Sequence, residues 1–96
     1  MNSTRASLRV VTYPKHIWRQ IKNTTCQDLV RALERDGFKL YPERKGAVRL
    51  YIHPDGRQVT IHWHPHKTYR PGLLKKLLED VGWTTADDLR RVGLIK

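Results

Sequence analysis

The sequence predicts a two-layer α+β domain, in which two helices cover one face of a small antiparallel sheet in the order helix, three strands, helix. Residues 24–38 and 73–82 carry apolar residues at helical spacing. Three strand-like segments lie between them, and a tight Pro54-Asp55-Gly56 turn joins the last two. Such a fold leaves the second face of the sheet free for a partner.

The first helix has clear signals at both ends. Thr25 followed by Asp28 is an Asp-bearing capping box, which satisfies the free amides of the first turn. Gly37 can adopt the left-handed conformation that ends a helix. The apolar positions predicted to face the core are Cys26, Leu29, Val30 and Leu33.

The strand candidates are residues 38–41, 47–53 and 58–64, and Pro42 cuts the first one short. In the third strand, alternation assigns one set of side chains to the core: Val59, Ile61 and Trp63. The opposite set is Thr60, His62 and His64. The second strand leaves two choices open: Val48, Leu50 and Ile52, or Arg49, Tyr51 and His53.

The remaining segments complete the predicted organisation. Pro71-Gly72 introduces the second long helix, and Gly82 ends it. A last helix is expected to start at Thr84 or Thr85. We therefore expect a basic N-terminal extension (1–23, with a possible strand at 8–13 and a helical turn at 16–22), a central domain (24–83) and a C-terminal helical extension (84–96).

Charge is the most informative property of the composition. The net charge is +10, and residues 1–72 hold fourteen basic and five acidic side chains, or +9. A small domain this basic favours a polyanionic partner, because each neutralised phosphate releases bound counterions. Nucleic acid is therefore the favoured partner, ahead of a merely solubilising surface or an acidic protein.

Several classes are disfavoured by the same sequence. No stretch approaches the roughly 20 apolar residues that span a bilayer, and the N-terminus has no apolar signal-peptide core. Cys26 is the only cysteine, so no intramolecular disulfide can form. We expect a cytoplasmic protein without membrane contact; the sequence indicates no oligomeric state.

Three stretches, "LVRALERDGF", "KGAVRLYIHPDGRQVTIHWH" and "RPGLLKKLLEDVGW", resemble the HicA (YcfA-like) family of small toxins over residues 25–83. The resemblance implies an α-β-β-β-α double-stranded-RNA-binding-like fold. It also implies an mRNA interferase, an endoribonuclease that needs no cofactor and is blocked by a cognate antitoxin. The family places its proton-accepting histidine in a Lys-Gly-Ser-His motif.

This chain departs from that motif at its central position. Gly46 matches, Ala47 stands where Ser or Gly is usual, and Val48 occupies the histidine position. Valine cannot accept a proton, and loss of a general base typically costs about 10²–10⁴ in rate. We therefore expect an RNA-binding protein with weak or absent cleavage. The alternatives are an active interferase that uses another histidine, a disabled variant, or a protein-interaction module with Val48 on an exposed apolar strip.

The other histidines are candidates for the missing chemistry. His64 and His53 are the candidate catalytic residues, although His53 is also well placed to bond the turn backbone. His62, His64 and His66 alternate as metal ligands could, but Pro65 breaks the strand, and no Cys or nearby carboxylate completes a zinc set. We expect no metal and no other cofactor.

The candidate RNA contacts mix cations with aromatic rings. Basic side chains would bind phosphates, and rings would stack on bases unless they belong to the core. The predicted RNA-binding residues are Arg44, Lys45, Gly46, Arg49, Tyr51, Arg57, His62, Lys67 and Arg70.

Overall fold

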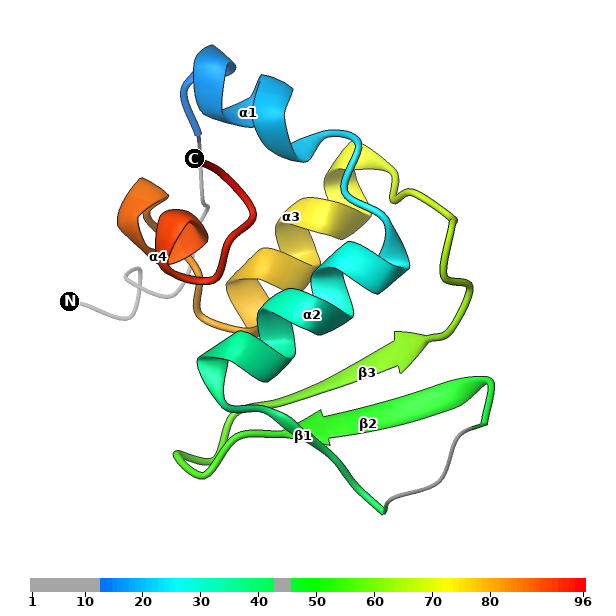
Figure 1. Cartoon of the computed structure of the whole chain (residues 1–96). Coiled ribbons are helices and arrows are strands. Elements are labelled where there is room, and N and C mark those ends of the chain that lie inside the picture. The colour runs from blue at the N-terminus through cyan, green and yellow to red at the C-terminus, as the bar shows by residue number, and fades with distance from the viewer. Residues whose placement is uncertain (1–12, 43–45) are drawn as a thin grey trace, which may run out of the picture.

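The structure, a computed structural model, describes residues 13–42 and 46–96 and confirms the predicted α+β class. Helices lie on one side of a three-stranded sheet, and none of the described helices lies on the other side (Figure 1). In chain order the elements are α1 (Lys15–Ile21), α2 (Cys26–Asp36), β1 (Lys39–Leu40), β2 (Val48–Ile52), β3 (Gln58–His62), α3 (Pro71–Asp80) and α4 (Ala86–Arg91).

The sheet is antiparallel, with strand order β1-β2-β3. β1 pairs only Lys39 with Ile52 and Leu40 with Tyr51, whereas β2 and β3 pair along their full lengths. Pro42 lies two residues beyond β1 and lacks the amide that would continue the ladder. The central hairpin, β2 and β3, is therefore the main platform of the sheet.

The main core lies between the sheet and helices α2 and α3. Val59 and Ile61 of β3 face it, as the alternation predicts, and Trp63 packs at its edge. In β2 it is Tyr51 that faces inward, with only 2% of its surface exposed. The open question of how β2 faces is thus resolved: Val48, Leu50 and Ile52 lie on the outer side.

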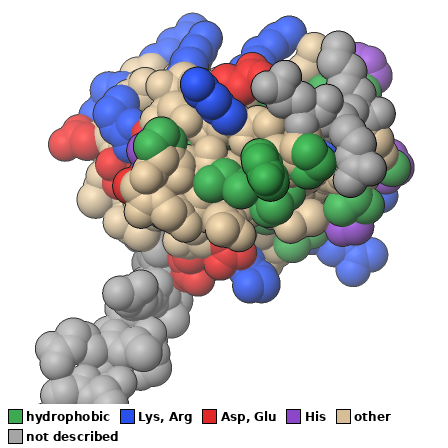
Figure 2. Space-filling view, turned by 90° about the horizontal axis from the view of Figure 1, so that it is seen from below, with side chains coloured by type: hydrophobic (Ala, Val, Ile, Leu, Met, Phe, Trp, Pro, Cys, Tyr) green, Lys and Arg blue, Asp and Glu red, His purple; other side chains and the backbone are tan. Residues whose placement is uncertain are grey.

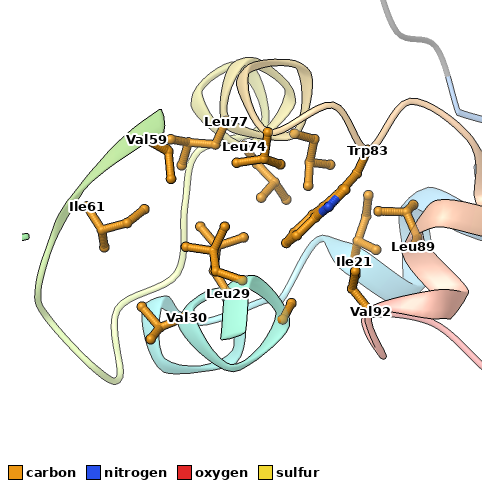
Figure 3. Close-up of a cluster of buried hydrophobic side chains, with 14 of the residues drawn as sticks. Ile21, Leu29, Val30, Val59, Ile61, Leu74, Leu77, Trp83, Leu89 and Val92 are labelled. Carbon is orange, nitrogen blue, oxygen red and sulfur yellow. The ribbon is translucent and has the colours of Figure 1, made fainter. Parts of the chain in front are cut away.

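Both terminal segments take part in the same core. Ile17 and Ile21 of α1 are buried, and so are Leu89, Val92 and Ile95 at the C-terminal end. Figure 3 shows Trp83 lying between the α2–α3 side chains and those of Ile21, Leu89 and Val92. The expected extensions therefore pack onto the central unit where the structure describes them. The possible strand at 8–13 lies outside the described residues except for Tyr13, which is in no strand.

The helix ends agree with the capping signals. Thr25 and Asp28 exchange both capping-box hydrogen bonds, and Gly37 ends α2 at a φ of 107°. Thr85, rather than Thr84, caps α4 through the same arrangement with Asp88. α3 starts at Pro71, earlier than expected, because proline fits the first helical position. Within the described residues, no helix is long and apolar enough to cross a membrane.

Candidate nucleic-acid interface

The outer face of the sheet carries an apolar strip beside polar side chains. Val48, Leu50 and Ile52 of β2 form the strip, and Val48 is 59% exposed. Figure 2 views the molecule from this side and shows hydrophobic side chains gathered in one patch, with histidines toward one edge. The β3 partners across the strip are His62, Thr60 and Gln58. None of the described helices lies on this face of the sheet (Figure 1).

Val48 and His62 are direct partners across the β2–β3 ladder. The Trp63 amide donates to the Ala47 carbonyl at 2.7 Å and the His53 amide to the Arg57 carbonyl at 2.8 Å, so the hydrogen-bonded pairs fall on the odd-numbered positions. Val48 and His62 then form a non-hydrogen-bonded pair, in which side chains approach most closely, with Cβ atoms about 4.5–5.5 Å apart. An imidazole therefore lies beside the valine, on the opposite strand.

A pocket of about 640 Å³ lies where β3 ends and α3 begins. It is lined by Cys26, His62, His64, Lys67, Thr68, Tyr69, Arg70 and Leu73. Three predicted RNA contacts, His62, Lys67 and Arg70, thus line one hollow together with the candidate catalytic residue His64. His62 belongs both to this pocket and to the outer sheet face.

His53, the other candidate catalytic residue, is held by the turn and by α2. Its Nε2 atom lies 2.7 Å from the Asp36 carbonyl oxygen, and its Nδ1 atom accepts the Asp55 amide at 3.1 Å. Its ring also contacts Phe38 edge-on. Both ring nitrogens are therefore engaged, and the geometry favours the turn-bonding role that the sequence also offered.

Asp36 is a buried carboxylate that sequence reasoning missed. Its side chain is only 5% exposed and accepts three charged or polar donors: Arg57 at 2.9 Å, Trp83 at 2.8 Å and Arg91 at 2.7 Å. Burial raises the pKa of Asp36, but the hydrogen bonds from Trp83, Arg91 and Arg57 outweigh burial and hold that pKa below its ordinary value. Asp36 therefore links α2 to the hairpin turn, the end of α3 and α4.

Two of the predicted RNA contacts have other roles in this geometry. Tyr51 is buried against the helices, so its ring cannot stack on a base at the surface. Arg57 binds Asp36, Asp55 and the Val81 carbonyl, so its guanidinium already has partners within the chain. Tyr51 and Arg57 are therefore left out of the candidate interface.

The remaining predicted contacts differ in position. Arg49 donates to the Gly46 carbonyl at 3.1 Å, and its guanidinium lies 4.1 Å from the Trp63 ring centroid. Gly46, Lys67 and Arg70 are exposed. Arg44 and Lys45 lie outside the described residues. The structure therefore gathers the cations around the end of β3 and the start of α3, away from the Pro54-Asp55-Gly56 turn.

Within residues 13–42 and 46–96, no three His, Cys, Asp or Glu side chains lie together as a metal site would require.

Comparison with known proteins agrees with the fold and the motifs. A search of curated proteins found no match. The family model of the HicA toxin of bacterial toxin–antitoxin systems matches residues 26–83, more than half of the chain. The chain therefore belongs to the HicA toxin family.

Proposed function

We propose that this protein is a cytoplasmic RNA-binding member of a toxin–antitoxin pair in which mRNA cleavage is weak or absent. The observation that carries the proposal is Val48, which is 59% exposed on the outer sheet face. A substrate phosphodiester could reach this position, but an aliphatic side chain offers it no proton acceptor. The nearby cations would still bind phosphates.

The decisive experiment restores the missing imidazole. Purified wild-type chain and the Val48→His variant are incubated with the same transcript, and the ends of the products are analysed. The wild type is expected to leave the transcript largely intact, and Val48→His to cleave it about 10²–10⁴ times faster. Because Val48 is exposed, the substitution costs little folding free energy.

The matched control is Val48→Gln, which adds a polar side chain with no proton-accepting nitrogen. It is expected to behave as the wild type does. Wild-type cleavage as fast as that of Val48→His would overturn the claim that residue 48 limits the chemistry.

A second candidate function is cleavage through another histidine, and the pairing of His62 with Val48 favours it. An imidazole on β3 could accept the proton of a ribose hydroxyl close to the point that a histidine at 48 would serve. His64 lines the same pocket as His62. RNA products with cyclic phosphate ends, formed by the wild type and absent with His62→Ala or with His64→Ala, would support this function. The variant that loses the products identifies the histidine. Intact RNA at high protein concentration would exclude it.

A third candidate is protein recognition through the outer apolar strip. The inward position of Tyr51 leaves Val48, Leu50 and Ile52 facing out, and exposed apolar strips commonly mark partner surfaces. The partner expected from family membership is a cognate antitoxin. Leu50→Glu is then expected to abolish capture of co-expressed antitoxin, whereas Gln58→Glu, a similar change of charge on the same face, is expected to retain it.

A further inference from the structure

The pocket between β3 and α3 has an apolar floor and a cationic rim. Cys26, only 1% exposed, and the partly buried Tyr69 contribute to the floor, and Leu73, 49% exposed, forms one wall. His62, His64, Lys67 and Arg70 surround the opening. An apolar lining with positive charge at its edge matches a nucleotide, which has an aromatic ring at one end and a phosphate at the other.

The charge of this pocket separates it from two other hollows in the described residues. No carboxylate lines it, whereas Asp28 lines the hollow between α1, α2 and the C-terminus, and Asp80 lines the one between β3 and α3's outer flank. Burial raises the pKa of the Tyr69 hydroxyl, so the phenol stays neutral beside an anion. An anionic ligand would therefore meet no opposing charge from the pocket lining.

The loop that carries the rim is fixed to the start of α2. The amides of Cys26 and Gln27 donate to the carbonyls of Lys67 and Pro65, at 2.9 and 3.1 Å. Thr25 and Thr68 form an isolated β-bridge, and the Cys26 thiol contacts the His62 carbonyl oxygen at 3.6 Å. The rim is thus held in place before any ligand arrives, which lowers the entropy cost of binding.

We propose that this pocket accepts one unstacked nucleotide of a single-stranded RNA, with its base on the Tyr69–Leu73 side and its phosphate among the rim cations. The inference rests on the proposed RNA binding and deepens it. A base in a duplex remains stacked and paired, so it cannot enter the pocket. The pocket therefore gives the protein a preference for single strands that charge alone would not produce.

The test compares one short RNA, single-stranded or annealed to its complement, by fluorescence anisotropy at fixed low salt. The wild type is expected to bind the single strand about tenfold more tightly (about 1.4 kcal/mol), because only an unstacked base can contact the aromatic ring in the pocket. Leu73→Glu puts a carboxylate in the pocket wall and is expected to remove that preference. Leu73 is half exposed, so the variant should fold, and circular dichroism checks this.

The matched control is Thr84→Glu, the same change of charge at an exposed position beyond α3. It is expected to weaken both RNA forms slightly and equally. Equal wild-type affinity for single strand and duplex, or a Leu73→Glu variant that behaves as Thr84→Glu does, would overturn the pocket and leave the proposed function standing. Absence of RNA binding in the wild type would overturn both.

Binding of adenosine monophosphate distinguishes two ligands that the pocket could take, a free nucleotide and a nucleotide within an RNA strand. Saturable binding of the free nucleotide that is lost in Leu73→Glu would support the pocket and extend it to mononucleotides. No binding of the free nucleotide, together with an intact single-strand preference, would assign the pocket to nucleotides within a strand. Free-nucleotide binding that Leu73→Glu leaves unchanged would place that ligand elsewhere and count against the pocket.

Discussion

At the scale of single residues, Asp36 connects segments that lie far apart in the sequence. One nearly buried carboxylate accepts donors from Arg57, Trp83 and Arg91, and its own carbonyl contacts His53. A buried charge is stable only when it is paired and hydrogen-bonded, and here each side-chain oxygen has a donor. The Asp36 side chain is therefore one of the links that fix the hairpin turn to the helical layer, beside the contact of His53 with the Asp36 carbonyl and that of Arg57 with the Val81 carbonyl.

We predict that Asp36→Asn lowers the free energy of unfolding by about 2–4 kcal/mol at neutral pH, because Arg57 and Arg91 lose their shared counter-charge. Asp87→Asn is the control, since Asp87 is 94% exposed, and it should change stability little. Urea unfolding measures both. Equal stability of the two variants would contradict the role assigned to Asp36.

The pH dependence follows from the same carboxylate. The folded-state pKa of Asp36 lies below the ordinary value of about 3.9, so its stabilising contribution is fully present above that value. The contribution is lost as the pH falls through the folded-state pKa. Asp36→Asn should therefore show a shallower loss of stability below about pH 4 than the wild type. Parallel acid profiles would contradict this expectation.

At the scale of elements, the capping box of α2 and the loop contacts at the start of that helix position the candidate pocket. α2 begins with a complete capping box, and the same first turn receives the loop that carries Lys67. The start of α2 is therefore specified by its local sequence, and it also holds the loop through tertiary hydrogen bonds. α3, by contrast, begins at Pro71 without a side-chain cap.

We predict that Thr25→Ala lowers the free energy of unfolding by about 1 kcal/mol, because the Asp28 amide loses its acceptor. Thr84→Ala is the control, because Thr84 is exposed and caps no helix. Thermal unfolding followed by circular dichroism compares them. A Thr25→Ala variant as stable as the control would show that the cap contributes nothing measurable.

At the scale of the whole molecule, charge and shape divide the surface by function. The helices cover one face of the sheet, and the apolar strip and the histidines lie on or beside the other (Figures 1 and 2). The net charge of +10 favours long-range attraction of a polyanion. The proposed pocket would add a local preference for single-stranded over double-stranded RNA. The affinity for RNA and the preference for single-stranded RNA are therefore expected to respond to different substitutions.

We predict that Lys67→Gln weakens RNA binding and reduces the slope of log affinity against log salt by about 0.7–0.9, the loss of one phosphate contact. Lys15→Gln on α1 removes the same charge away from the sheet and should leave the slope nearly unchanged. Anisotropy titrations at several salt concentrations measure both. Equal slopes in the two variants would indicate that Lys67 does not contact RNA.

Local patterns predicted much of this structure, and the failures came from contacts between distant residues. The capping box at Thr25, the stop at Gly37 and the facing of β3 follow from spacings of a few residues. The facing of β2 was ambiguous because both of its alternating sets could be buried. Asp36 looked like an ordinary acid at a helix end because its partners are 21, 47 and 55 positions away.

Some features of the candidate site could likewise be predicted from local sequence, whereas others depend on contacts between distant residues. That His53 bonds the turn could be anticipated from its place beside Pro54, whereas the burial of Tyr51 and the capture of Arg57 by Asp36 depend on the packed helices. The pairing of Val48 with His62 required the strand register, which the turn alone did not fix. The packing of α1 and α4 against Trp83 likewise depends on residues far apart in the chain.

The register of the central hairpin also bears on how relatives of this chain are compared. Residues 48 and 62 project from neighbouring strands to the same side of the sheet. A histidine at either position would therefore occupy nearly the same place, and two homologues could differ in which strand carries it without any change of the backbone. An aligned column that follows position 48 alone would record such an exchange as a loss. Homologues are better grouped by the chemistry of the two columns taken together.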